Sequence, residues 1–144
     1  MYIIPVDYTD FGGIDRKEEF LFNLTEAELM DMNLSSDEGL ENYLTKIIQA
    51  KDKAQLYALF KTIIRKSYGE KSPDGRRFMK SDELYKAFTE TEAYSQIFMD
   101  LVTDSKKAAA FMNGIIPAKL KAKMKDVDHT TLPISFINVN PENA

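Results

Sequence analysis

The chain has 144 residues, of which 44% are hydrophobic, so it is long and apolar enough for one domain with a buried core and too short for two ordinary domains. It has no cysteine and one histidine, which excludes disulfides, thiolate nucleophiles and cysteine-based metal sites. No apolar run approaches the ~18 to 20 residues of a membrane span, and the N-terminus lacks the basic flank of a signal peptide. We therefore expect a cytoplasmic protein without a membrane partner.

Charge is distributed unevenly around a net value of −4. Residues 1–50 hold 3 Lys or Arg against 11 Asp or Glu, whereas residues 51–80 hold 9 against 3. Blocks of opposite sign can neutralise one another within a fold or between subunits, so we expect self-association or an acidic, helical partner. A small nucleic-acid-binding regulator that uses the basic block 61–80 is the minor alternative, because such domains are usually clearly basic overall.

The N-terminal residues have the period of two that is typical of strands. Residues 2–8 are β-prone, and a second segment places three apolar side chains on one face: Phe20, Phe22 and Leu24. The residues between the two segments have the glycines of a turn, so we predict a β-hairpin. Because proline cannot donate to a ladder, Pro5 either keeps the first strand on an edge or breaks it.

From Thr25 onward the apolar residues have a helical period. Thr25 and Glu28 have the spacing of a capping box for a helix that ends at Met32. Further helices are predicted at 37–51, 53–68, 82–88, 90–102 and 105–113. The first two of these have the strongest apolar stripes and are expected to form the core. Gly69 and Gly114 are expected to end the helices that precede them.

A second capping box is predicted from Thr89 and Glu92, at the start of the helix 90–102. Together these patterns predict a mainly α (α+β) fold, in which an N-terminal β-hairpin is followed by five or six short helices. We expect this single hairpin-plus-helices domain to span residues 1–117.

The segment after residue 117 has conflicting signals. Residues 118–125 alternate lysine with apolar residues at period two, although these residue types favour a helix. Farther on, the segment around Ile134 and Phe136 is apolar, β-prone and bracketed by prolines, which favours an extended form. We interpret it as either a docked tail or a partner-binding strand, and expect residues 118–144 to form a flexible C-terminal tail with at most one helix.

The most informative segment is a basic loop between two predicted helices. Its centre, Ser72–Gly75, reads Ser-Pro-Asp-Gly, where proline presets one φ angle and glycine allows a positive one, so a tight turn is predicted. Four basic residues surround one aromatic residue here: Lys71, Arg76, Arg77, Lys80 and Phe78. Because the core does not need such a loop, we predict that these five residues form part of a partner-binding surface. The alternative is a solvated loop with Phe78 folded inward.

Residues suited to catalysis or metal binding are few. A single histidine and no cysteine leave almost no material for a nucleophile and its base. Asp126, Asp128 and His129 could ligate a metal, but they lack a fourth ligand, so a solvated polar segment is the stronger interpretation. We therefore predict that the protein is not an enzyme and needs no cofactor or metal.

Four blocks of sequence resemble a known family. The first block begins at Phe20 and reads Phe-x-Phe-Asn-Leu-Thr, and the second begins at Tyr68 and reads Tyr-Gly-x-Lys-Ser-Pro-Asp-Gly-Arg-Arg-Phe-x-Lys-Ser. The third begins at Phe88 and reads Phe-x-x-Thr-Glu-Ala-Tyr-Ser-x-x-Phe-Met. The fourth begins at Ala108 and reads Ala-Ala-Ala-Phe-x-Asn-Gly-Ile-Ile-Pro. In this order and spacing they resemble the tail assembly chaperones of long-tailed bacteriophages and prophages. The resemblance spans residues 1–117.

The resemblance implies a non-enzymatic protein of the host cell cytoplasm that is absent from the mature virion. It also implies two partners, because such chaperones bind the tape measure protein and help tail tube subunits to polymerise around it. The composition agrees with this role, since a small helical protein with mixed charge can cover the apolar faces of a long helical partner. We also expect a homo-oligomer, because the hairpin offers a strand edge.

Overall fold

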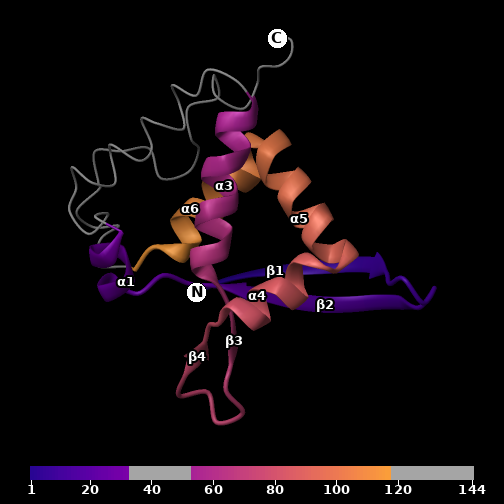
Figure 1. Cartoon of the computed structure of the whole chain (residues 1–144), viewed down its shortest axis with the longest axis horizontal. Helices are drawn as coiled ribbons and strands as arrows, with labels where there is room; N and C mark the ends of the chain where they lie inside the picture. The colour runs from indigo at the N-terminus through magenta and orange to yellow at the C-terminus, as the bar shows by residue number, and fades with distance from the viewer. Residues whose placement is uncertain (33–52, 118–144) are drawn as a thin grey trace.

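The computed structural model describes residues 1–32 and 53–117 (Figure 1). The strands are β1 (Tyr2–Thr9), β2 (Asp15–Phe22), β3 (Tyr68–Lys71) and β4 (Phe78–Met79). The helices are α1 (Glu26–Asp31), α3 (Lys53–Ser67), α4 (Asp82–Thr89), α5 (Glu92–Thr103) and α6 (Ser105–Ile115). The α+β class with an N-terminal hairpin is confirmed, whereas the predicted helix 37–51 and the tail from residue 118 lie outside the described residues.

β1 and β2 form the predicted antiparallel hairpin, with Tyr2 opposite Phe22 and Thr9 opposite Asp15. Residues alternate between a solvent face and a face covered by helices, as the period of two requires. The covered face holds four buried side chains: Val6, Tyr8, Phe20 and Phe22. Pro5 lies on an edge strand as expected, because β1 is the outer strand of a four-stranded sheet in the order β1-β2-β3-β4.

Asp10 organises the turn of this first hairpin. Its carboxylate accepts hydrogen bonds from the backbone N–H groups of Gly12 at 2.8 Å and Ile14 at 2.9 Å, and from Nε of Arg16 at 2.6 Å. These bonds hold the pKa of Asp10 below its ordinary value, with the bond from Ile14 as the largest cause and the bond from Arg16 as the next. Gly13 has a φ of 82°, where a side chain would be strained.

The basic loop is a second hairpin, β3–β4, which the sequence analysis did not predict. α3 ends at Ser67, one residue earlier than expected, and the chain continues directly as β3. β3 pairs with β2 through Leu21–Gly69 and with β4 through Glu70–Met79. The expectation that Gly69 ends a helix was wrong, because Gly69 lies within the strand. A Cβ there would be 2.7 Å from the carbonyl oxygen of Met79, so glycine permits close strand packing.

The capping box of α1 is confirmed, whereas the predicted start of α5 is wrong. Thr25 Oγ1 accepts from the N–H of Glu28 at 3.2 Å, and Glu28 Oε1 accepts from the N–H of Thr25 at 2.8 Å. α5 is capped by Thr91, whose hydroxyl accepts from the N–H of Tyr94 at 3.2 Å. Thr89 is instead the last residue of α4, which explains why no capping box forms there.

α6 also differs from its predicted end. It begins after the cap Asp104, whose carboxylate accepts from the N–H of Lys106 at 3.0 Å, but it continues through Gly114 to Ile115. The expectation that Gly114 ends the helix was therefore wrong. A Cβ at this position would overlap the ring of Tyr2, so the glycine allows β1 to pack closely on α6.

The core is broader than the two helices expected from the sequence. α3, α5 and α6 lie on one side of the first hairpin, and β3–β4 extends away from them (Figure 1). Phe22 is fully buried at the centre, with ring centroids 5.7 Å from Tyr68, 6.0 Å from Phe88 and 5.4 Å from Phe111. Such pairs add about 0.5 to 1.5 kcal/mol each beyond the burial of their area. The hairpin is therefore part of the core.

Candidate functional site

The tip of the β3–β4 hairpin is a preformed turn. The N–H of Ser72 donates to the carbonyl of Arg77 at 2.8 Å, and the N–H of Gly75 donates to the carbonyl of Ser72 at 2.8 Å. Gly75 has a φ of 76°, which favours glycine. The predicted tight turn at Ser72–Gly75 is confirmed.

A second set of hydrogen bonds stabilises this turn from inside. The buried hydroxyl of Ser72 donates to Oδ1 of Asp74 at 2.7 Å and accepts from the N–H of Arg77 at 3.0 Å. Asp74 also accepts from the N–H of Arg76 at 3.1 Å. These bonds, with the Ser72 hydroxyl as the larger cause, hold the pKa of Asp74 below its ordinary value. The adjacent side chains are therefore presented on an ordered tip.

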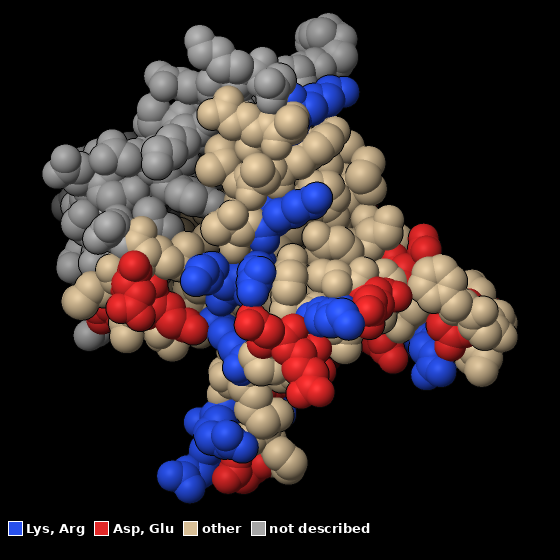
Figure 2. Space-filling view, viewed as in Figure 1, with Lys and Arg blue, Asp and Glu red and all other residues tan. Residues whose placement is uncertain are grey.

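Three of the five residues predicted for this site are exposed: Lys71, Arg76 and Arg77. In Figure 2 the charged groups on the projecting β3–β4 hairpin are mainly basic. Phe78 is half-buried, because its ring lies against Gly69. The exposed cations can bind carboxylates on a partner, and arginine can do so with two parallel hydrogen bonds.

Lys80, the fifth predicted residue, lies at the base of the hairpin and makes contacts within the chain. Its Nζ donates to Oε2 of Glu28 at 2.7 Å, to the carbonyl of Asn23 at 2.7 Å and to the carbonyl of Lys66 at 2.8 Å. Its side chain is only 21% exposed. Lys80 therefore links the second hairpin to α1 and to the end of α3. Sequence reasoning missed this because two of the three partners are more than 50 residues away.

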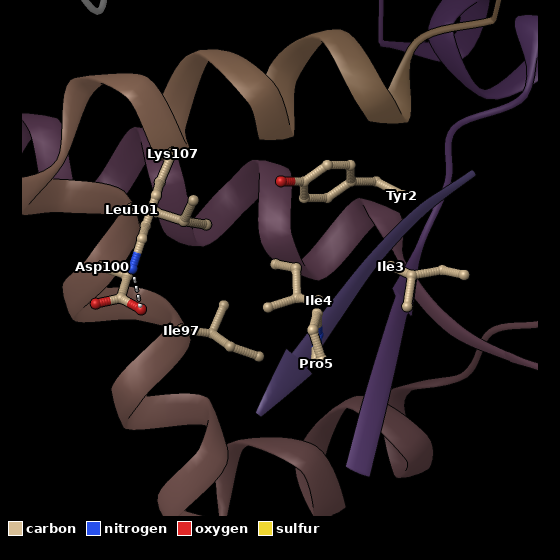
Figure 3. Close-up of a pocket in the computed structure, with 8 residues that line it drawn as sticks. All are labelled: Tyr2, Ile3, Ile4, Pro5, Ile97, Asp100, Leu101 and Lys107. Atoms are coloured by element: carbon tan, nitrogen blue, oxygen red, sulfur yellow. Dashed lines mark hydrogen bonds and ion pairs between the residues drawn. The ribbon is translucent and has the colours of Figure 1, made fainter. Parts of the chain in front are cut away.

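A groove between β1 and the helices α5 and α6 was also missed by the sequence analysis. Its volume is about 220 Å³, and Figure 3 shows Tyr2, Ile4 and Leu101 pointing into it. An ion pair of 3.2 Å between Asp100 and Lys107 lies at its rim. Ligand pockets usually have about 300 to 1,000 Å³, so this groove fits one or two apolar side chains better than a cofactor.

The tip of the first hairpin exposes two apolar side chains. Phe11 is 80% exposed and Ile14 is 56% exposed, on either side of the two turn glycines. Large apolar side chains at the end of a projecting hairpin are suited to contacts with another protein. The turn was predicted from its glycines, but nothing in the sequence indicated that these two side chains would lie outside the core.

The described residues show no site for a metal. No three His, Cys, Asp or Glu side chains of residues 1–32 and 53–117 are close enough together to hold an ion. In the same part of the chain, no helix is long and apolar enough to cross a membrane. Asp126, Asp128 and His129 lie outside the described residues, as do Ile134 and Phe136.

Two exposed hairpin tips, a small apolar groove and mixed surface charge define a small α+β protein with surfaces suited to protein contacts. The chain belongs to the phage tail assembly chaperone family, whose model matches residues 1–142. This match extends beyond residue 117, where the resemblance seen in the sequence ended. No curated protein and no solved structure matches the chain.

Proposed function

We propose that this tail assembly chaperone binds the tape measure protein and assists polymerisation of the tail tube around it. It acts in the host cell cytoplasm without catalysis and does not remain in the mature virion. Family membership supports the assembly role. The observation that supports a binding site is the ordered, exposed basic tip of the β3–β4 hairpin.

The tip suits an acidic, helical partner on physical grounds. Arg76 and Arg77 are exposed, and neither has an ion pair among those found in the described residues. The turn beneath them is already held by Ser72 and Asp74, so binding would cost little ordering of the backbone. Arginine side chains in such positions are frequent sites of large affinity losses on truncation.

Replacement of both Arg76 and Arg77 by alanine tests this surface. The thermal midpoint should stay nearly unchanged, because both side chains are exposed. Affinity for the tape measure protein should fall about tenfold or more, which is the scale expected when one or two interface arginines are lost. Replacement of the exposed Lys53 and Lys106 by alanine is the control for loss of two positive charges. Unaltered binding of the arginine variant would remove the tip from the interface.

The C-terminal segment is a second proposed contact. Ile134 and Phe136 belong to a β-prone segment that could add to a sheet of a partner. Amide hydrogen exchange should be fast at both residues in the free protein and slow in the complex. Strong protection in the free monomer would assign the segment to the fold of the chaperone itself.

Self-association is also proposed, because alternating charge blocks and exposed hairpins offer complementary surfaces between copies. Light scattering at high protein concentration and low salt should detect species larger than a monomer. A monomer under all of these conditions would contradict the proposal.

Nucleic-acid binding through residues 61–80 stays the alternative. The cations of this block are divided between α3 and the second hairpin, and Arg65 forms an ion pair of 2.8 Å with Asp82. On the face in Figure 2, acidic groups are interspersed among the basic ones. Retention on DNA that decreases steeply with salt would favour this alternative.

A further inference from the structure

β2 and β3 separate soon after they meet. Within the described residues they pair at two positions, Leu21–Gly69 and Phe22–Tyr68. Beyond these, β2 continues toward the first hairpin tip while β3 turns away with β4 (Figure 1). The space between the two strands is a cavity of about 470 Å³, which we call the strand fork. Its lining includes the charged residues Glu18, Glu19, Glu70 and Lys71.

The backbone of β2 directs hydrogen-bonding groups into the strand fork. The N–H of Asn23 donates to the carbonyl of Ser67 at 2.8 Å, and Leu21 lies opposite Gly69 in the same ladder. In an antiparallel ladder, every second residue of a strand points its N–H and C=O groups toward the same neighbouring strand. The next residue in this series is Glu19, which has no partner on β3 among the described residues. Its N–H and C=O therefore face the fork.

The outer edge of the sheet is protected against pairing with another strand, whereas the strand fork is not protected in this way. Pro5 removes a donor from the free edge of β1, and α5 packs against this strand. The exposed arm of β2 has no proline. It has charged side chains instead, which discourage indiscriminate pairing and select a partner by charge.

The charge at the strand fork is predominantly negative. Its lining holds three carboxylates, those of Glu18, Glu19 and Glu70, against the one ammonium of Lys71. Glu18 also accepts the hydroxyl of Tyr8 at 2.6 Å, so its position is fixed from the covered face of the sheet. An occupant that pairs with the backbone would thus place alternate side chains near carboxylates.

We propose that the strand fork is a β-addition site for an extended, basic segment of a tail protein. The segment would hydrogen-bond to the backbone of Glu19, and its Lys or Arg side chains would meet the carboxylates of the fork. Strand addition of this kind takes affinity from the main chain and specificity from alternate side chains. The proposal extends the proposed chaperone function, because it assigns a second contact to a partner of that assembly.

Amide hydrogen exchange with model peptides tests the site on the full chain. The probe is the peptide Lys-Val-Lys-Val-Lys-Val-Lys, compared with Glu-Val-Glu-Val-Glu-Val-Glu and with the basic peptide N-methylated at alternate residues. The basic peptide should slow exchange at the N–H of Glu19 about tenfold or more, while the already paired Leu21 changes little. The acidic and N-methylated peptides should have no effect. Equal protection by the acidic peptide, or none by the basic one, overturns the proposal.

Charge reversal at the strand fork provides the matched variant. The double substitution Glu19→Lys and Glu70→Lys should weaken binding of the basic peptide about tenfold or more. Asp31→Lys, a substitution at an exposed position of α1, should leave this binding unchanged. Near-UV circular dichroism checks that the variant is folded. If the folded variant binds the basic peptide with unchanged affinity, the proposal that the carboxylates of the strand fork select a basic segment is overturned.

Binding to the tape measure protein distinguishes a failure of this site from a failure of the proposed function. If the fork variant loses the peptide but binds the tape measure protein normally, the fork binds a different tail protein segment and the chaperone function stands. If the wild-type protein protects Glu19 on peptide binding but never binds the tape measure protein, the function fails and the β-addition site stands.

Discussion

Replacement of Lys80 by methionine should destabilise the fold, because this side chain links three elements. Lys80 Nζ donates to one carboxylate and two carbonyl oxygens at 2.7 to 2.8 Å, and its side chain is 21% exposed. Hydrogen bonds to charged groups contribute about 1.5 to 3 kcal/mol when buried. Because this ammonium keeps some water contact, we expect loss of the whole set to lower the free energy of unfolding by about 2 kcal/mol. This corresponds to a decrease of about 6 °C in the thermal midpoint.

Lys71→Met is the matched control, because it makes the same change of side chain at an exposed position of the same hairpin. It should alter the free energy of unfolding by about 0.5 kcal/mol or less. Urea unfolding of both variants, and of each combined with Glu28→Gln, would measure the coupling of Lys80 to Glu28. If Lys80→Met is no more destabilising than Lys71→Met, the proposed link between the hairpin, α1 and α3 is refuted.

Three further predictions concern packing and charge. Gly114→Ala should lower the thermal midpoint although alanine favours helices by about 1 kcal/mol, because the clash with Tyr2 costs about 1 to 3 kcal/mol. A raised midpoint would contradict this close approach. Gly69→Ala should destabilise by about 2 kcal/mol in urea unfolding, and an unchanged midpoint would show that β4 can shift. Asp10→Ala should be less stable than wild type at neutral pH. Because folding lowers the pKa of Asp10 from 3.8, this difference should disappear as pH falls through the folded pKa. A difference independent of pH would exclude the carboxylate as its cause.

Several features that depend on near neighbours in the chain were predicted correctly from the sequence, although the capping box at Thr89 was not. The first hairpin, the capping box of Thr25 and Glu28, and the tight turn of the second hairpin are all present. Each requires residue types within a few positions of one another, so the sequence alone contains the signal.

Features that depend on distant partners were not predicted. β3 and β4 have four and two residues, too few for a visible period of two, and β3 exists because β2 lies beside it. The contacts of Lys80 and the role of Gly114 likewise come from residues that approach only in the folded chain. The basic tip was identified from its composition, but the strand fork required the register of the sheet.

We propose that this protein binds the tape measure protein and keeps it soluble until the tube forms, and this claim can be tested directly. The direct measurement is the soluble amount of tape measure protein produced with and without the chaperone, followed by affinity purification through a tag on the chaperone. We predict that co-production raises the soluble amount and that the two proteins purify together. A tape measure protein that is equally soluble alone, or that stays insoluble and unbound when the folded chaperone is present, would contradict the claim.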